Sequence, residues 1–325
     1  MKAAQLVARR TLEMVDVAEP VTEDGQAKIK VEAVSPCGSD IHGSFDAHMA
    51  EERYPLAPGM PCHEVVGTII ESKTDEIREG QRCIVLPTRG MGGMVEYITQ
   101  VPERIIPVPD WGPIDEWMMC QHSGTVLFSA KHWGNPAGKR IAVLGQGGIG
   151  LSFTMLAEKQ GAQQVIGIDL LDYRLEKSRD LGATDTVNPD KDNLIEALEE
   201  ITGGEGVDVV VDASGDPAGL ETCIHAVKRH GTILGFSLTG SEGKRASFVH
   251  SDWMRKAVSI IPTQVAGTDR PTSEIREMVA LKERGWMDPG LLKSHTLTFD
   301  DAQMAYDMYT NHSEGVIKVS VSIPG

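Results

Sequence analysis

The chain has 325 residues, 41% hydrophobic and 24% charged, which is the composition of a globular protein long enough for two domains. Its 31 basic and 47 acidic residues give a formal net charge of −16, which argues against a nucleic-acid partner and against an anionic membrane surface. No apolar run reaches the roughly 18 residues of a spanning helix, and the N-terminus lacks a signal peptide's long apolar region, so a cytoplasmic location is expected. The five cysteines are scattered, which favours ligand or buried-thiol roles over disulfides.

The N-terminal third of the chain is typical of short antiparallel strands. Apolar residues alternate with polar ones or form short runs between glycine and proline residues. The predicted strands cover residues 4–7, 27–34, 65–70, 81–86, 94–98 and 104–108. Short strands with this punctuation predict a small barrel-like β domain.

From about Trp117 onward, strand and helix patterns alternate along the chain. The predicted strands are 141–145, 165–169, 184–187, 207–212, 232–236 and, as a sixth, 258–265; the predicted helices are 151–161, 174–181, 193–201 and 218–230. Alternation of this kind predicts a parallel sheet with helices on both faces.

Two more helices, 271–286 and 300–309, precede a last alternating strand at 315–323 that is expected to return to the first domain. The expected domains are therefore 1–116, 117–265 and a return segment, 266–325.

A glycine-rich turn joins the first strand of this second region to its first helix. The motif G-x-G-x-x-G is formed by Gly145, Gly147 and Gly150, with Gly148 and Ile149 between them. Such a turn needs residues without a Cβ, lets a pyrophosphate approach the backbone, and directs helix N–H groups at the phosphates. A strand before it, a helix after it and an acid downstream together indicate a dinucleotide site.

The acid is Asp169, about 20 residues after Gly150, at the end of the next strand. Its carboxylate is placed to accept both ribose hydroxyls of an adenosine and to repel a 2′-phosphate, which favours NAD over NADP. Arg174 softens that preference, because it could lie near the ribose or bind a phosphate. The alternative is that Arg174 is a solvated cation on a helix.

A second group of residues suggests a metal centre. Cys37 offers a thiolate and His63 an imidazole, both suited to zinc, which would lower the pKa of an alcohol. Ser39 and His42 could then pass a proton to water, and Asp40 could orient His63. Taken alone, the same residues also fit a buried thiol, a hydrogen-bonded core histidine and a surface histidine.

The order Cys-Gly-Ser-Asp-Ile-His-Gly, then His-Glu, then G-x-G-x-x-G with a downstream acid, resembles the medium-chain dehydrogenase/reductase family. The closest branch is that of zinc-dependent alcohol and polyol dehydrogenases, and the resemblance includes the C-terminal Gly-Val-Ile-Lys-Val. It implies an α/β fold, in which a GroES-like β-barrel domain is joined to a doubly wound Rossmann domain.

The resemblance also implies roles for individual residues. At the metal it implies zinc ligands at Cys37 and His63, Glu64 beside the ion, Asp40 behind His63, and a proton relay of Ser39 and His42. At the cofactor it implies Ile149 and Thr125 beside the nicotinamide, backbone groups near Gly235 and Phe236 at its carboxamide, and Asp169 with Arg174 at the adenosine ribose.

This chain departs from the family pattern at three places. The lobe of closely spaced cysteines that holds a structural zinc is missing, so no structural zinc is expected. Cys62 replaces the usual glycine before His63 and is expected to be a buried thiol. The position of the third zinc ligand carries Gln121, a neutral amide; either the adjacent Cys120 binds, or Glu64 completes the site, or the site is empty.

The sequence therefore predicts an NAD(H)-dependent oxidoreductase that interconverts an alcohol and its carbonyl compound, with zinc as the Lewis acid. One alternative is a zinc-free reductase of the same family, acting on an activated double bond or carbonyl. The other is a non-catalytic nucleotide-binding protein. The expected partner is a small alcohol or carbonyl substrate, and the expected assembly is a homodimer or homotetramer.

Overall fold

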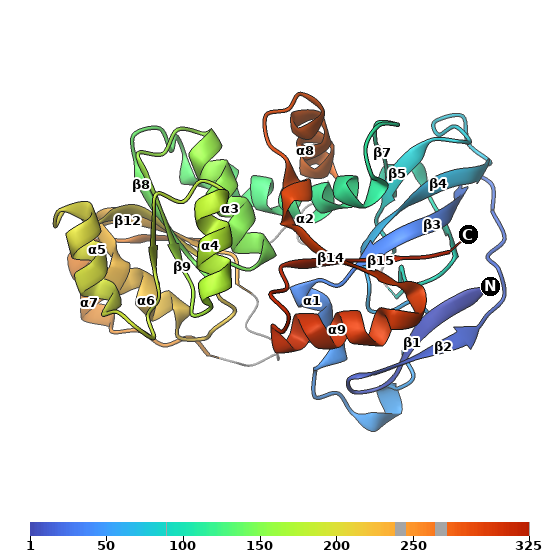
Figure 1. Cartoon of the computed structure of the whole chain (residues 1–325), viewed down its shortest axis with the longest axis horizontal. Coiled ribbons are helices and arrows are strands. Elements are labelled where there is room, and N and C mark those ends of the chain that lie inside the picture. The colour runs from blue at the N-terminus through green and yellow to red at the C-terminus, as the bar shows by residue number, and fades with distance from the viewer. Residues whose placement is uncertain (89, 238–244, 264–271, 325) are drawn as a thin grey trace. The chain divides into compact units, whose positions relative to one another are not determined.

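The computed structural model describes residues 1–88, 90–237, 245–263 and 272–324. The chain divides into two compact units: unit 1 is Met1–His122 with Ile275–Gly325, and unit 2 is Ser123–Glu274 (Figure 1). The domain limits expected from the sequence stay a prediction, and part of the boundary near 265 lies outside the described residues.

Unit 1 is built on strands, as predicted. They are β1 (Lys2–Ala8), β2 (Thr11–Asp16), β3 (Ala27–Ser35), β4 (Glu64–Ser72), β5 (Arg82–Val85), β6 (Tyr97–Gln100), β7 (Ile105–Pro107), β14 (Lys293–Thr298) and β15 (Lys318–Ser322). One sheet has the order β14-β15-β3-β4-β5-β7, with β6 also paired to β3, and β1 and β2 form a separate pair. The C-terminal strand β15 thus lies next to β3, far from it in sequence.

Short helices complete unit 1. They are α1 (Gly38–Asp40), the π-helix η1 (Ile41–Phe45), η2 (Glu51–Arg53), η3 (Pro102–Arg104), α8 (Ser273–Glu283), η6 (Pro289–Leu292), η7 (Phe299–Asp301) and α9 (Ala302–Asn311). Alternate residues of β3, namely Ala27, Ile29 and Val31, point into the core, which α9 closes with Tyr306. This core holds β3 and β4 in the register that brings Ser35 opposite Glu64.

Unit 2 contains a parallel sheet. Its strands are β8 (Arg140–Leu144), β9 (Gln164–Ile168), β10 (Asp185–Val187), β11 (Val207–Asp212), β12 (Val227–Gly235) and β13 (Ser259–Pro262), in the order β10-β9-β8-β11-β12-β13. Every pairing in this sheet is parallel. The strand order reverses between β8 and β11, since β9 and β10 follow on one side of β8 and β11 to β13 on the other. Ligands bind at such a point in doubly wound folds.

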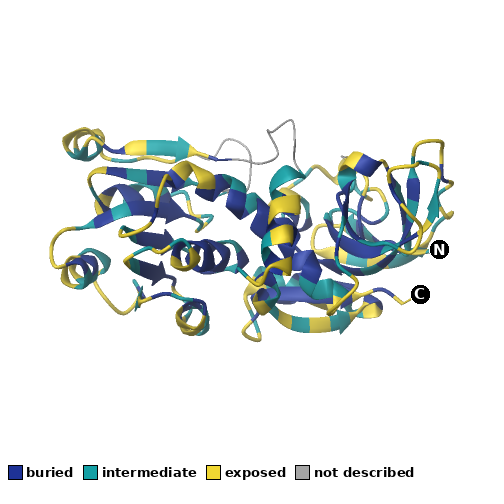
Figure 2. Cartoon of the chain, turned by 90° about the horizontal axis from the view of Figure 1, so that it is seen from above, coloured by how far each residue is buried: buried dark blue, intermediate teal, exposed yellow. Residues whose placement is uncertain are grey.

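Helices cover both faces of that sheet (Figures 1 and 2). They are α3 (Gly148–Lys159), α4 (Asp172–Asp180), α5 (Leu194–Thr202), α6 (Gly219–Ala226) and α7 (His250–Lys256). Helix α5 begins after Asn193, whose side chain accepts from two backbone N–H groups, and ends at the left-handed Gly203. The predicted α/β class, a β domain with a doubly wound parallel sheet, is therefore confirmed.

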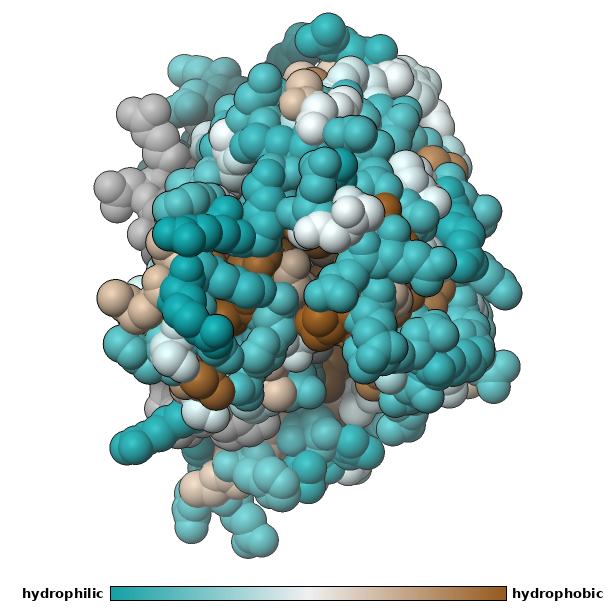
Figure 3. Space-filling view, turned by 90° about the vertical axis from the view of Figure 1, so that its left-hand side faces the viewer, coloured by the Kyte–Doolittle hydropathy of each residue, from teal (hydrophilic) through white to brown (hydrophobic). Residues whose placement is uncertain are grey.

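The surface of unit 2 that carries α5 and α7 is mostly hydrophilic, with scattered apolar side chains (Figure 3). Buried residues are concentrated in the strands and in the helix faces that pack on them (Figure 2). In the described part of the chain, none of the helices is long and apolar enough to cross a membrane.

Several elements differ from the sequence expectation, and strands β2 and β14 were not predicted. The helix predicted at 218–230 ends at Ala226, because β12 begins at Val227 and pairs with Val207 of β11. Helix α2 (Ile114–Ala130), which crosses the boundary between the units, was not predicted, because it is buried on almost all sides and has no polar stripe. The predicted strand 258–265 is described as far as Pro262 of β13, and residues 264 and 265 lie outside the described residues.

Candidate active site

Strand pairing in unit 1 brings the predicted metal ligands together. Strands β3 and β4 run antiparallel, and Ser35 at the end of β3 pairs with Glu64 at the start of β4. Cys37 follows β3 and His63 immediately precedes β4. Two segments that are distant in sequence therefore meet at one edge of the sheet.

The ligand atoms of Cys37, His63 and Glu64 all lie within 4.8 Å of one another. Among the described residues, these three form a cluster of histidine, cysteine and acidic side chains that could hold a metal ion. A thiolate, an imidazole and a carboxylate form a donor set that suits zinc. Cys37 and His63 are partly exposed, whereas Glu64 is fully buried.

Asp40 lies behind His63. Its Oδ1 atom is 2.6 Å from His63 Nδ1, and the backbone N–H of Cys37 donates to its Oδ2 atom at 3.0 Å. Burial lowers the pKa of His63, but the charge of Asp40 and hydrogen bonds to Asp40 and Cys37 outweigh it and raise that pKa well above its usual value. Nδ1 is thus occupied by Asp40, and the Nε2 atom faces the other ligand candidates.

Ser39 lies beside the ligand candidates. Its Oγ atom donates to Cys37 Sγ at 3.3 Å and lies 3.4 Å from His63 Nε2. His42 is exposed on η1, the π-helix that follows α1. Interrupted helical turns of this kind occur often at functional sites.

Glu64 forms a buried ion pair that the sequence analysis missed. Its Oε2 atom is 2.5 Å from Nζ of Lys318, which also donates to the carbonyl oxygen of Pro36 at 2.8 Å. The other oxygen, Oε1, is buried and has no hydrogen-bond partner among the described residues. Burial raises the pKa of Glu64, but the charges of Lys318, His122 and His63 outweigh it and lower the value.

The sequence did carry a signal for Lys318. Lys318 is the one charged residue of the strand Lys318–Ser322, whose other residues are valine or serine. In the structure, every residue of Lys318–Val321 is buried. A lysine is rarely fully buried unless it is paired, so its place in that strand indicated a buried acid.

The amide at the expected third-ligand position is also buried. Gln121 is 5% exposed, and its Oε1 atom has no hydrogen-bond partner in the part of the chain that the structure describes. The neighbouring Cys120 does not join the metal-binding group, and burial raises the pKa of its thiol to about 12. Cys62 is a buried thiol that donates to the carbonyl oxygens of Ser35 and Glu64.

The glycine-rich turn of unit 2 has the geometry that a pyrophosphate needs. Gly145 has a φ of +89°, and a Cβ on Gly150 would lie 1.7 Å from the carbonyl oxygen of Gly145. Around Gly147 the space is open, since a Cβ there would first meet Arg174 at 3.9 Å. Helix α3 starts at Gly148, so its N-terminus and the half-buried Ile149 lie at this turn.

Asp169 directly follows β9 and is 8% exposed. Its two oxygens accept from the backbone N–H groups of Gln146 at 2.6 Å and Leu171 at 2.9 Å. The guanidinium of Arg174 lies 3.6 Å from the carboxylate. Each carboxylate oxygen keeps a second lone pair, so the acid can still accept ribose hydroxyls.

Gln146 is a further residue that the sequence analysis did not identify. It is fully buried, donates to the carbonyl oxygen of Val143, and accepts from the Thr154 hydroxyl, both at 2.9 Å. The sequence signal was a polar side chain inside the glycine motif together with Thr154 on the helix that follows the motif. These bonds tie the turn to β8 and α3.

The remaining predicted cofactor residues also lie in unit 2. Thr125 is on α2 and is partly exposed. At the end of β12, the N–H of Phe236 donates to the carbonyl oxygen of Asp212, and the carbonyl oxygen of Gly235 accepts from Thr263. The contribution of Gly235 and Phe236 to a carboxamide site stays a prediction.

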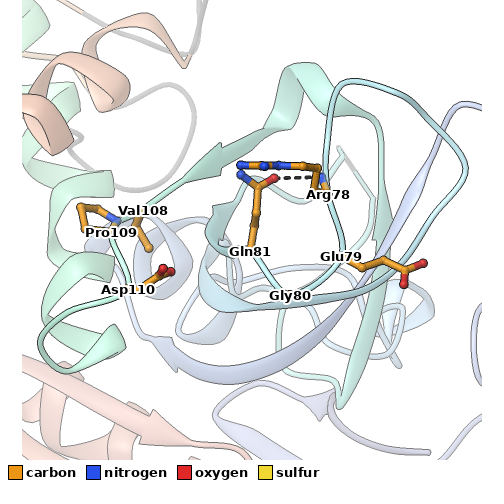
Figure 4. Close-up of a pocket in the computed structure, with 7 residues that line it drawn as sticks. All are labelled: Arg78, Glu79, Gly80, Gln81, Val108, Pro109 and Asp110. Atoms are coloured by element: carbon orange, nitrogen blue, oxygen red, sulfur yellow. Dashed lines mark hydrogen bonds between the residues drawn. The ribbon is translucent and has the colours of Figure 1, made fainter.

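A separate surface pocket of about 420 Å³ lies in unit 1 between the turn before β5 and the segment after β7 (Figure 4). It is lined by Arg78, Glu79, Gly80, Gln81, Val108, Pro109 and Asp110. The backbone N–H of Arg78 donates to the Gln81 side chain at 2.8 Å. None of the predicted catalytic or metal-binding residues lines this pocket.

Comparison with known proteins agrees with both units. The family described as alcohol dehydrogenase GroES-like domain matches residues 23–110, and the family described as zinc-binding dehydrogenase matches residues 148–284. An uncharacterized zinc-type alcohol dehydrogenase-like protein of Haemophilus influenzae is 30% identical over 268 residues, which cover 74% of this chain and 76% of that protein.

Two further proteins extend the comparison over nearly the whole chain. The (R,R)-butanediol dehydrogenase of Bacillus subtilis is 26% identical over 333 residues, which cover 93% of each protein. A crystal structure described as a short chain alcohol dehydrogenase from Escherichia coli CFT073 in complex with NADH has a TM-score of 0.86 over 99% of each chain, at 20% identity. The chain therefore belongs to the zinc-dependent alcohol and polyol dehydrogenase branch of the medium-chain dehydrogenase/reductase family, and it is an alcohol dehydrogenase-like oxidoreductase.

Proposed function

We propose that this protein is an NAD(H)-dependent dehydrogenase that interconverts an alcohol, secondary or polyol-like, and the corresponding carbonyl compound. The observation that carries the proposal is the convergence of Cys37, His63 and Glu64, with His63 fixed by Asp40. The butanediol dehydrogenase relative supports a secondary alcohol.

The residues of the cluster fit a zinc ion. Cys37, His63 and Glu64 supply sulfur, nitrogen and oxygen, and Glu64 Oε1 is a buried acceptor without a partner among the described residues. A bound zinc would supply Lewis-acid chemistry that polarises the substrate oxygen. Asp40 on Nδ1 keeps the Nε2 atom of His63 available as a ligand.

Glu64 is the proposed third ligand. Gln121, at the position where the family resemblance places a zinc ligand, is the proposed neutral fourth contact, and its amide oxygen too is buried without a partner in the described part of the chain. Cys120 is a poor candidate, because it does not belong to the group of side chains whose ligand atoms lie together.

Ser39 and His42 are the proposed route for the substrate proton. Ser39 Oγ lies next to both Cys37 Sγ and His63 Nε2, so it is within reach of an oxygen held at these ligands. His42 is exposed and can exchange the proton with water.

NAD is the proposed cofactor, with its pyrophosphate at the turn of Gly145, Gly147 and Gly150, and NADP is disfavoured. The carboxylate of Asp169 repels a 2′-phosphate, and Arg174, at 3.6 Å, partly neutralises it. When bound, NAD supplies the acceptor for the hydride of the alcohol carbon.

The experiment is a measurement of turnover and metal content on the same protein. Purified without chelator, the wild type should carry one zinc per chain and oxidise secondary alcohols with NAD. Cys37→Ser should lose both zinc and turnover. Cys83→Ser, a buried cysteine of the same sheet whose thiol contacts Gly67, should keep both. Turnover on activated double bonds without zinc would favour the zinc-free reductase, and NAD binding without any turnover would favour a non-catalytic protein.

A homodimer or homotetramer and a cytoplasmic location complete the proposal. Among the described residues, β13 lies at one edge of its sheet, with partly exposed Ile260 and Ile261, and pairing with a second copy would cover it. Sedimentation at micromolar concentration would test the assembly, because a monomer would exclude it.

A further inference from the structure

The carboxylate of Asp40 is fixed by donors from three different parts of unit 1. His63 Nδ1 lies 2.6 Å from Oδ1, whereas Oδ2 accepts from the Cys37 backbone at 3.0 Å and from the Tyr306 hydroxyl at 3.4 Å. Asp40 is 3% exposed, so these groups replace water around it. A buried carboxylate keeps one orientation only when such donors hold it.

Tyr306 reaches this carboxylate from the C-terminal helix α9. It is 1% exposed, and its ring packs on Phe45 with the centroids 4.9 Å apart. Phe45 ends η1, the helix that follows the segment of Cys37 and Ser39. The ring of Tyr306 packs on an apolar side chain, whereas its hydroxyl group donates a hydrogen bond to the carboxylate of Asp40.

The division of donors between the two oxygens determines what His63 meets. With the Cys37 N–H and the Tyr306 hydroxyl on Oδ2, Oδ1 is left for His63 Nδ1. A carboxylate that accepts from Nδ1–H fixes the imidazole ring and leaves the Nε2 lone pair free for a metal.

We propose that Tyr306 is a positioning residue of the metal site, which acts through Asp40 on His63 and thereby raises the zinc affinity of the Cys37, His63 and Glu64 cluster. This inference rests on the proposed metal site. Tyr306 itself has no proposed contact with substrate or metal.

The test compares the zinc affinity of Tyr306→Phe with that of the wild type by competition with a chromogenic chelator. The substitution keeps the ring and its packing on Phe45 and removes only the hydroxyl. The matched control is Tyr54→Phe, because the Tyr54 hydroxyl is buried without a hydrogen-bond partner among the described residues and its side chain packs on the same core. Cobalt-loaded protein adds a readout of ligand geometry through its visible absorption bands.

Tyr306→Phe should bind zinc about threefold to tenfold more weakly, less than the 10-fold to 100-fold loss typical when the group hydrogen-bonded to a ligand is removed. Its cobalt bands should shift, and Tyr54→Phe should change neither quantity. In an Asp40→Asn background, Tyr306→Phe should lower the zinc affinity by less than about a further twofold, because the carboxylate through which Tyr306 acts on His63 is already absent.

Equal zinc affinity and identical cobalt bands in Tyr306→Phe and wild type would overturn the inference and leave the proposed function standing. So would an undiminished loss in the Asp40→Asn background. A wild-type protein that binds no zinc would instead overturn the metal site itself, and this inference with it.

Discussion

The ammonium group of Lys318 lies 2.5 Å from Oε2 of Glu64, and the two side chains are 1% and 0% exposed. Burial lowers the pKa of Lys318, but the charge of Glu64 raises it above its usual value. Because Lys318 also donates to the carbonyl oxygen of Pro36, one cation joins the segments that carry Cys37 and Glu64. The last strand of the chain thus holds the two halves of the candidate metal site in place.

Replacement of Lys318 should be strongly destabilising. Lys318→Met leaves the Glu64 carboxylate buried without its partner, which costs about 3–5 kcal/mol in comparable buried pairs. Urea unfolding of the whole protein without added zinc checks this, because a zinc ion at Glu64 would otherwise be a second partner for the carboxylate. Lys318→Arg is the variant that keeps the charge. Unfolding of Lys318→Met at the wild-type midpoint would show that the pair contributes nothing.

Two glycines of the phosphate turn should respond differently to alanine. A Cβ at Gly150 would meet the Gly145 carbonyl oxygen at 1.7 Å, so Gly150→Ala should disrupt the folding of unit 2. Gly147 has a φ of −71° and room for a Cβ, so Gly147→Ala should fold normally. It should nevertheless bind NAD at least about tenfold more weakly, because the methyl group occupies the path of the pyrophosphate.

Calorimetric titration with NAD and thermal unfolding separate the two effects. If Gly147→Ala bound NAD as the wild type does, the pyrophosphate would lie elsewhere. A stable Gly150→Ala protein would mean that the strand and helix can move apart at this turn.

Asp169 should determine the preference between the two nicotinamide cofactors. Asp169→Asn keeps one of the two acceptors for the backbone and removes the charge, so the NAD to NADP affinity ratio should fall by about tenfold. Asp180→Asn, an exposed acid on the same unit, serves as the control. An unchanged NAD to NADP affinity ratio would show that another group distinguishes the ribose of the two cofactors.

The extent to which the sequence predicted this site follows from the range of each interaction. The geometry of the glycine turn depends on a local motif and was predicted. The contact between Asp40 and His63, which are 23 residues apart, was predicted from the two short motifs that carry the family resemblance. Lys318 and Tyr306 reach Glu64 and Asp40 from the C-terminus, and no local pattern specifies which buried lysine or tyrosine meets which acid. Helix α2 was missed for a related reason, since a helix buried on all sides shows no periodicity.

An exposed cluster in unit 1 should make stability depend on pH. Asp46 pairs with Arg9 at 2.5 Å and Arg10 at 2.6 Å. The hydrogen bond from Arg10 lowers the pKa of Asp46, and the charges of both arginines add to this effect. Because the folded pKa is below the unfolded value of about 3.9, the stabilisation is complete above that pH and is lost as the pH falls through the folded pKa.

Asp46→Asn should therefore destabilise the protein at pH 7, by no more than about 1 kcal/mol because the pair is partly exposed and screened. The difference from wild type should shrink below about pH 4. Chemical unfolding across this pH range measures it, with the exposed Asp16→Asn as a control. A difference that stays constant with pH would contradict the assignment.

The central claim is that Cys37, His63 and Glu64 hold one zinc ion, and X-ray absorption at the zinc edge tests it most directly. The wild type should show one sulfur ligand at about 2.3 Å and nitrogen or oxygen ligands at about 2.0–2.2 Å, and the sulfur contribution should vanish in Cys37→Ser. A spectrum without sulfur in the wild type, or one that Cys37→Ser leaves unchanged, would contradict the account.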